Sequence, residues 1–228
     1  NPKKPYPYKE EKVAFLNENG GHKLAGTLTL PKGEGPFPAA ILISGSGPQD
    51  RDETLLGHKP FLVLADHLTR NGIAVLRYDD RGVAKSEGDF TAATSMDFSF
   101  DAEAAFKYLQ GRKEIKADGI GFAGHSEGGL IAPIVAARNE KVAFIILLAG
   151  PGIKCSELMV LQNDAFGKAA GQFPKIRELN RKINSAVYQV VIAEPDNEKA
   201  KAQINKRVTE ITADQPEFFQ KQYAQALE

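Results

Sequence analysis

The segment Gly124-His125-Ser126-Glu127-Gly128 contains residue types that could carry out nucleophilic chemistry. It fits the pattern G-x-S-x-G, in which a sharp turn from a strand into a helix lifts a serine hydroxyl above a sheet. The glycines carry no side chain, so they avoid a clash in this turn. A hydroxyl presented in this way can attack a carbonyl carbon and form a covalent acyl intermediate. Ser126 is therefore the candidate nucleophile, and Gly124 and Gly128 are the glycines that the turn requires.

Acyl transfer also needs donors for the negative charge that develops on the attacked carbonyl oxygen. The backbone N–H of Glu127, at the start of the following helix, is one candidate donor. The run SGSG at residues 44–47 leaves its backbone uncrowded, and we predict the N–H of Ser46 as the second donor. Taken alone, this run equally fits a glycine-rich turn that binds nothing.

A serine nucleophile further needs a base and a group that orients this base. His125 adjoins Ser126 on a sharp turn, where neighbouring side chains diverge, so we expect it to pack rather than to reach the hydroxyl. His58 and His67 are expected at the surface or on the flank of a helix. His22 also precedes the turn, and no histidine follows His125. We therefore assign neither the base nor its acid to a residue of this chain.

A sheet is needed to position these loops, and apolar strand-like runs alternate with amphipathic segments along the chain. Strands are expected at residues 12–17, 23–30, 38–43, 73–78, 119–123 and 142–148, with a hairpin at Gly20-Gly21. Helices are expected around residues 61–68 and from Asp97, as N-cap, to Gly111. The alternation predicts the α/β class: a mostly parallel sheet with helices on both faces.

Ligands of such sheets bind beyond the carboxyl ends of the strands. Three polar loops follow strands there, at residues 44–52, at residues 79–88 and at Ser126. The first loop carries charges of both signs, which either line an acyl pocket or brace the loop. We favour bracing by ion pairs to Arg81, because a loop rich in both signs commonly pairs its own charges. The residues concerned are Asp50, Arg51, Asp52 and Glu53, and the same two interpretations apply to Asp79, Asp80 and Arg81.

Residues 1–150 are expected to form the core domain, and the character of the sequence changes at Gly150-Pro151. Beyond this point there is no convincing strand, and apolar residues repeat at helical spacing. They are Ile176, Leu179, Ile183, Val187 and Val191, then Ile204, Val208 and Ile211, and finally Phe218, Phe219 and Tyr223. We interpret residues 151–228 as a helical cap inserted after a strand. A helical appendage that only completes the core is the alternative.

The composition excludes several classes of protein. Lys and Arg total 29 and so do Asp and Glu, so no overall field attracts nucleic acid or an anionic membrane surface. No apolar run approaches the length of about 18 residues that a membrane span needs. Cys155 is the only cysteine, which excludes an internal disulfide and a multi-cysteine zinc site, and we expect it to be a buried or cap-facing apolar residue. The chain begins at Asn1, which fits an exported protein after signal removal as well as a trimmed cytoplasmic one, so the compartment stays open.

Cofactor motifs are not expected either. Gly119, Gly121 and Gly124 spell G-x-G-x-x-G, but a dinucleotide fingerprint has its glycines in the turn after a strand, and here the first two lie inside the expected strand. No phosphate-binding loop and no metal-ligand spacing occurs in the sequence. We therefore predict neither a cofactor nor a metal.

Three motifs in order resemble the α/β-hydrolase superfamily: ILISGSGPQDRDE at residues 41–53, RYDDRGVAKS at residues 77–86 and GHSEGG at residues 124–129. The most similar branch is that of bacterial carboxylesterases with a helical cap, near dienelactone-hydrolase-like and serine-aminopeptidase-like proteins. The resemblance covers residues 10–150 and implies that Ser126 is the nucleophile and that Ser46 and Glu127 supply the oxyanion amides. It also implies that residues 153–228 begin the cap. Ala84 stands where such loops commonly carry glycine, so a differently shaped turn is expected there.

The resemblance implies hydrolysis of a small carboxylic ester through an acyl-Ser126 intermediate, without a cofactor. Amide hydrolysis by a serine-aminopeptidase-like enzyme is one alternative, and a non-catalytic domain that binds a small acyl ligand or a partner is another. In α/β hydrolases the acid and then the histidine follow the serine. We therefore expect the chain to stop inside or just after the cap, with the last core strands absent. Such a chain would turn over its substrate weakly, and its exposed sheet edge would favour a homo-oligomer.

Overall fold

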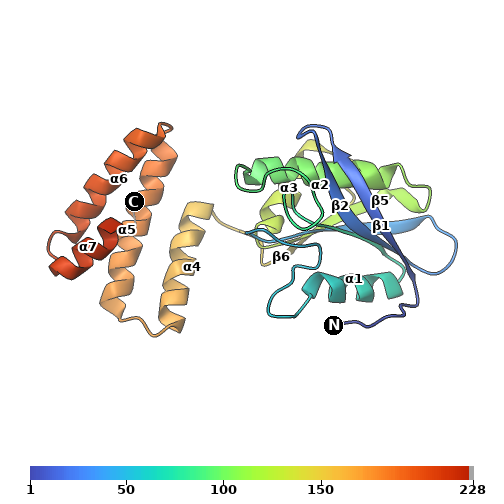
Figure 1. The fold of residues 1–228 in the computed structure, drawn as a ribbon, viewed down its shortest axis with the longest axis horizontal. Helices are drawn as coiled ribbons and strands as arrows, with labels where there is room; N and C mark the ends of the chain where they lie inside the picture. Colours follow the sequence, from blue (N-terminus) through green and yellow to red (C-terminus); the bar gives the residue numbers. More distant parts are fainter. Residues whose placement is uncertain (226–228) are drawn as a thin grey trace. The chain divides into compact units, whose positions relative to one another are not determined.

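The computed structural model describes residues 1–225 and divides the chain into two compact units (Figure 1). The first unit, Asn1–Pro151, combines strands and helices, and the second, Gly152–Glu228, contains helices alone within the described residues. The boundary lies where the sequence changes character.

A six-stranded sheet forms the centre of the first unit. Its order is β1-β2-β4-β3-β5-β6, in which β1 and β4 each pair antiparallel with β2 and the other three pairs are parallel. The strands are β1 (Lys9–Asn17), β2 (His22–Leu30), β3 (Phe37–Ile43), β4 (Ala74–Tyr78), β5 (Ile115–His125) and β6 (Ile145–Leu148). The predicted hairpin at Gly20-Gly21 is confirmed, because Asn17, the last residue of β1, pairs with His22, the first residue of β2. The mostly parallel sheet is confirmed as well.

Helices cover both faces of the sheet, as predicted (Figure 1). Helix α1 (Pro60–Arg70) packs against one face, where Phe61 and Ala65 join a buried cluster with Leu42 of β3. Helices α2 (Ser95–Gln110) and α3 (Gly128–Arg138) pack against the other face.

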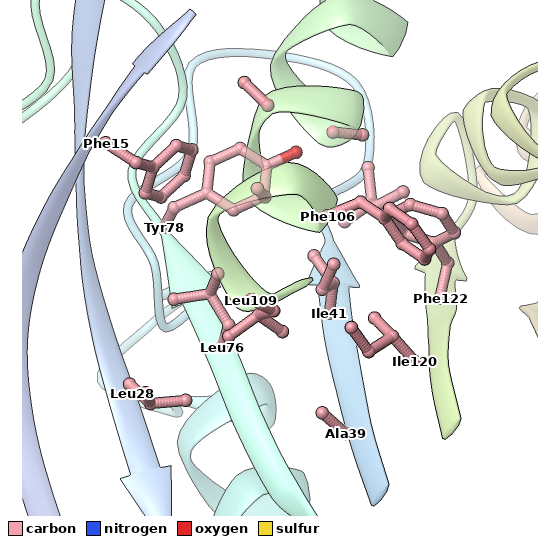
Figure 2. Close-up of a cluster of buried hydrophobic side chains, with 14 of the residues drawn as sticks. Phe15, Leu28, Ala39, Ile41, Leu76, Tyr78, Phe106, Leu109, Ile120 and Phe122 are labelled. Atoms are coloured by element: carbon pink, nitrogen blue, oxygen red, sulfur yellow. The ribbon is translucent and has the colours of Figure 1, made fainter. Parts of the chain in front are cut away.

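The larger core lies between the sheet and α2 and α3 (Figure 2). Ile41 belongs to this cluster and its neighbour Leu42 to the cluster under α1, since successive side chains of a strand point to opposite faces. The rings of Phe106 on α2 and Phe122 on β5 lie 5.9 Å apart at their centroids. This packing anchors β3 and β5, the two strands that end at the expected site.

The structure corrects the start of α2. Its N-cap is Thr94, whose hydroxyl oxygen accepts the N–H of Asp97, while the Asp97 carboxylate accepts the N–H of Thr94. This reciprocal pair is a capping box, in which the acidic residue occupies the third helical position. Asp97 therefore helps to start the helix, but the prediction that it is the N-cap is wrong.

Two strands differ from their expected bounds. Strand β5 is longer and contains Gly119, Gly121 and Gly124, so the apparent dinucleotide motif lies within a strand. Strand β6 covers only Ile145–Leu148, and all of its side chains are at least 38% exposed. Within residues 1–225, β6 is an edge of the sheet.

The second unit contains four described helices: α4 (Cys155–Ala169), α5 (Pro174–Ala193), α6 (Asn197–Thr212) and α7 (Glu217–Gln225). Its core joins Leu179 and Ile183 of α5 to Val208 of α6, as the apolar stripes predict. The prediction that Val191 ends the first apolar stripe is wrong, because Val190 is buried and Val191 is exposed.

Two side chains of the second unit also differ from expectation. Cys155, predicted to be a buried or cap-facing residue, is exposed at the start of α4. Phe218, expected to anchor the last helix, is 73% exposed. Within the described residues, no helix has the length and apolar character needed to cross a bilayer.

Candidate active site

Ser126 occupies the turn between β5 and α3, where it adopts a φ of 51° and is half-buried. A positive φ costs a non-glycine residue about 1–2 kcal/mol and persists only where the surrounding structure holds it. The Ser126 N–H donates to the carbonyl oxygen of Leu148 at 2.9 Å, and the Gly129 N–H donates to the carbonyl oxygen of Ser126 at 2.9 Å. This turn, residues 124–128, is called the nucleophile elbow below.

Backbone surrounds the two glycines of the elbow so closely that neither position admits a side chain. A Cβ on Gly124 would lie 2.0 Å from the carbonyl oxygen of Gly128, and a Cβ on Gly128 would lie 2.2 Å from that of Ile43. The end of β3 therefore packs directly against the first turn of α3. This contact explains in physical terms why the pattern requires glycine on both sides of Ser126.

The loop after β3, residues 44–52, lies against the elbow. A Cβ on Gly45 would be 3.2 Å from the Cβ of Ser126, so the backbone of the loop lies close against the elbow. Ser46 is exposed beside it, and Glu127 is the N-cap of α3, where free N–H groups and the helix dipole favour negative charge. Within residues 1–225 neither the Ser46 N–H nor the Glu127 N–H has a hydrogen-bond partner. Because the sequence predicts an oxyanion donor in residues 44–52, we refer to them as the oxyanion loop.

Buried Glu53 connects this loop to the elbow, a role that the sequence did not reveal. One carboxylate oxygen, Oε1, accepts the Gly45 N–H at 2.7 Å and lies 2.7 Å from Nδ1 of His125. His125 is thus more than a packing residue, because its Nδ1 contacts Glu53. This nitrogen does not face the Ser126 hydroxyl. The sequence signal was limited to a charged run that ends at Glu53, and nothing in its spacing pointed to His125, 72 positions away.

The charged residues do brace the loops, but with partners other than those expected. Arg51 pairs with Asp79, at 2.5 Å from Nη2 to Oδ2, and Asp52 pairs with Arg77. Burial alone would raise the pKa of Asp79, but hydrogen bonds from the Arg51 side chain and backbone outweigh burial and lower it. The Asp50 carboxylate accepts hydrogen bonds from the Asp52 N–H and from the N–H and hydroxyl of Thr54, all nearby in the chain.

Arg81 pairs with none of the loop acids, so that prediction is wrong. Its Nε donates to Oδ2 of Asp101 at 2.6 Å, and its Nη2 donates to the carbonyl oxygen of Asp97 at 2.6 Å. Both acceptors belong to α2, so Arg81 ties the loop after β4 to that helix. In the same loop, Ala84 adopts a φ of 48°, the left-handed conformation that glycine takes most readily.

The remaining histidines form no hydrogen bond to the elbow within residues 1–225. His22 is buried, with Nε2 3.0 Å from Oδ1 of Asp101. His58 and His67 are exposed, as predicted. The Glu127 side chain accepts a hydrogen bond from Ser95 at 2.5 Å, which ties the elbow to the start of α2. No group of three or more potential metal ligands lies close together in the described part of the chain.

Asp80 links the oxyanion loop to the loop after β4. Its Oδ1 accepts the Ser44 hydroxyl at 2.7 Å, and its Oδ2 accepts the Gln49 N–H at 2.9 Å. Burial raises the pKa of Asp80 from 3.8 to about 7, against the opposing effect of these two hydrogen bonds. The carboxyl group therefore keeps its proton in the folded protein at pH values where the unfolded chain has lost it.

Replacing Asp80 by asparagine should remove a pH dependence of stability. Between about pH 4 and about pH 7 the folded protein binds one more proton at Asp80 than the unfolded chain does, so stability falls as the pH rises through this window. The two pKa values correspond to a loss of up to about 4 kcal/mol above pH 7. The asparagine can still accept the Gln49 N–H and donate to Ser44. Urea denaturation at about pH 5 and about pH 8 should show the wild type losing more stability than Asp80→Asn.

A matched control is Asp118→Asn, because the Asp118 side chain is 78% exposed. This variant should follow the pH dependence of the wild type. Parallel curves for the wild type and Asp80→Asn would contradict the raised pKa.

This chain is similar to known proteins over part of its length. The family described as "Serine aminopeptidase, S33" matches residues 59–222. The chain is 38% identical to esterase EstD of Thermotoga maritima over 136 residues, which cover 60% of this chain and 32% of the esterase. It is 29% identical to the putative hydrolase YtaP of Bacillus subtilis, over 56% of this chain and 48% of that protein. It is also 29% identical to acyl-coenzyme A thioesterase 1 of Rattus norvegicus, over 56% of this chain and 27% of the thioesterase.

Solved structures share the fold. A hypothetical protein from Pseudomonas aeruginosa superposes with a TM-score of 0.55 at 20% identity, over 72% of this chain and 55% of that one. An esterase from Pyrococcus furiosus superposes with a TM-score of 0.54 at 19% identity, over 92% of this chain and 64% of the esterase. The match to each of the three curated relatives spans less than half of that relative's length.

Proposed function

Because the chain belongs to the serine aminopeptidase S33 family of α/β hydrolases, we propose that it cleaves small carboxylic esters through a covalent acyl intermediate on Ser126. The observation that carries this proposal is the strained backbone of Ser126, with its φ of 51°, between two glycines that admit no side chain. Backbone strain clusters at active sites, where the surrounding structure holds it. The 38% identity to an esterase favours an ester as the substrate.

In the proposed reaction the elbow supplies the nucleophile and one donor, and the oxyanion loop supplies the second donor. The Ser126 hydroxyl oxygen attacks the carbonyl carbon of the ester, and its proton passes to a base. The N–H groups of Ser46 and Glu127 donate to the oxygen that becomes negatively charged. The bond to the alcohol oxygen then breaks, and the alcohol leaves with a proton. Water attacks the acyl-serine in the same way, releases the carboxylic acid and restores the hydroxyl.

We assign the base to none of the four histidines of the chain. His22 is buried against Asp101, His58 and His67 are exposed, and Nδ1 of His125 faces Glu53. A serine without its base loses most of its rate, although the oxyanion donors retain part of it. We therefore expect slow turnover from these 228 residues by themselves, and activity is best measured on the natural full-length protein.

The helical unit is proposed to be the cap of this hydrolase. The family match, which runs to residue 222, includes almost all of this unit, which supports its being a part of the family fold. In many enzymes such lids gate the entry of substrate.

Amide hydrolysis is the second candidate, and the description of the matched family favours it. An ester and an amide pass through the same acyl-serine and differ only in the leaving group. Rates with p-nitrophenyl butyrate and with amino-acid p-nitroanilides, measured on the full-length protein, would separate the two. A higher kcat/KM for the anilides would replace the ester proposal by the amide one.

Labelling with a fluorophosphonate tests the nucleophile directly. The reagent phosphonylates an activated serine, and peptide mapping by mass spectrometry should place the adduct on Ser126. Prior incubation with an ester substrate should slow the labelling, because both reagents compete for the same hydroxyl. An adduct on another serine, or none, would contradict the proposal.

A further inference from the structure

We propose that Glu53 is a positioning residue for acyl transfer, because its carboxylate ties the oxyanion loop to the nucleophile elbow and so sets the spacing of the two backbone donors. This inference rests on the proposed function of Ser126. It concerns a side chain that need not touch the substrate.

The contacts of Glu53 reach both sides of the site. Gly45, whose N–H donates to Oε1 at 2.7 Å, directly precedes Ser46. His125, whose Nδ1 lies 2.7 Å from the same oxygen, directly precedes Ser126. A carboxylate only accepts, so Nδ1 of His125 carries the proton of this hydrogen bond. The two proposed oxyanion donors thus lie one and two residues from the two groups that Glu53 holds.

The burial and backbone of Glu53 fit a role in positioning. Glu53 is only 7% exposed. Glutamate is seldom buried unless partners satisfy its carboxylate. It also adopts a φ of 52°, which is uncommon for a non-glycine residue. Its N–H donates to the carbonyl oxygen of Asp50 at 2.9 Å, which closes the turn that directs the side chain inward. Strain of this kind persists only where the surrounding contacts hold the conformation, and the two hydrogen bonds of Oε1 are such contacts.

Within residues 1–225, no other side chain forms hydrogen bonds to both the oxyanion loop and the elbow. The Arg51–Asp79 and Ser44–Asp80 pairs attach the loop to the residues after β4, and Ser95 attaches Glu127 to α2. Without Glu53 the loop would keep its attachment to the sheet, and Ile43 and Ser44 would still pack on Gly128. However, packing alone would hold Gly45 and Ser46 against the elbow. The partly buried N–H of Gly45 would also lose its acceptor.

Donor spacing affects the transition state more than the bound substrate, because the oxyanion exists only after attack. Loss of one oxyanion donor lowers kcat by about 10²–10³-fold in a serine hydrolase. A donor that is displaced rather than removed should cost less. We therefore expect loss of the Glu53 link to lower kcat by about 10–100-fold and to leave KM within about threefold.

Two substitutions at Glu53 test this in the natural full-length protein, with p-nitrophenyl butyrate as substrate. Glu53→Met keeps a similar length and volume but offers no comparable acceptor, so kcat should fall by about 10–100-fold. Glu53→Gln keeps an amide oxygen with two lone pairs, so it should retain kcat to within about fivefold. Each rate is divided by the number of sites titrated with a fluorophosphonate, so that a loss of folded protein does not count as a loss of kcat.

Glu11→Met is the matched control. Glu11 lies on β1, at the other edge of the sheet, and its carboxylate likewise accepts a hydrogen bond, from Arg112 at 2.8 Å. This variant should keep the wild-type kcat per titrated site. Wild-type kcat per titrated site in Glu53→Met would overturn the inference.

A second pair of variants tests the link from its other end and does not depend on Glu53→Met being folded. His125→Phe removes the donor, whereas His125→Asn keeps an N–H near the position of Nδ1. We expect the phenylalanine variant to lose kcat and the asparagine variant to recover most of it. Equal kcat in both would overturn the inference. A wild-type protein that neither hydrolyses the ester nor reacts at Ser126 would instead refute the proposed function, and with it the role of Glu53.

Discussion

Ser126→Ala should lower kcat/KM for ester hydrolysis by the full-length protein by at least about 10⁴-fold, since removing the nucleophile of a serine hydrolase costs about 10⁶-fold in kcat. The residual rate would come from the oxyanion donors and from substrate binding, which do not need the hydroxyl. Alanine has the same difficulty as serine in adopting a φ of 51°, so the elbow should keep its shape. Initial rates with p-nitrophenyl butyrate and the melting temperature measure the two effects separately.

Ser185→Ala is the matched control for this prediction. Ser185 lies within α5, where alanine is a favourable residue, so activity and stability should remain close to wild type. Ester hydrolysis by Ser126→Ala at the wild-type rate would show that the reaction takes place elsewhere. A large drop in melting temperature would show that the elbow depends on the hydroxyl for its structure.

Gly128→Ala should destabilise the first unit severely. The new Cβ would lie 2.2 Å from the carbonyl oxygen of Ile43 and 2.8 Å from that of Ser44, and backbone atoms of a central strand cannot move aside easily. We expect a loss of about 3–5 kcal/mol, a large part of the 5–15 kcal/mol that typically stabilises a domain. Urea denaturation measures this loss, and poor recovery of soluble protein would agree with it.

The glycine at the end of α2 provides the comparison. A Cβ on Gly111 would meet its nearest neighbour, the carbonyl oxygen of Tyr108, at 3.6 Å, which is ordinary contact. Its φ of −79° also suits alanine. Gly111→Ala should therefore unfold within about 0.5 kcal/mol of the wild type. A Gly128→Ala protein as stable as Gly111→Ala would mean that the contact between β3 and α3 is looser than described.

The features of this protein that local sequence determined are those that depend on near neighbours in the chain. Alternating apolar runs predicted the mostly parallel sheet and the helices on both of its faces, because a strand and a helix each impose their own period on buried residues. The glycines around Ser126 predicted the sharp turn from β5 into α3. The boundary near Pro151 followed from the loss of strand signals. Errors such as Asp97 as N-cap or Val191 as a core residue amount to shifts of a few positions.

The tertiary structure alone decided which side chains far apart in the sequence come into contact. Glu53 and His125 are 72 positions apart, and His22 and Asp101 are 79 apart. Arg51 pairs with Asp79, and Arg81 pairs with Asp101. From the sequence alone, several other acidic residues were equally good candidates for these pairs. The position of a charged residue in the sequence does not identify its partner, because any residue of opposite charge could form the ion pair. The choice depends on which strand ends the sheet brings side by side, and that order is fixed by long-range packing.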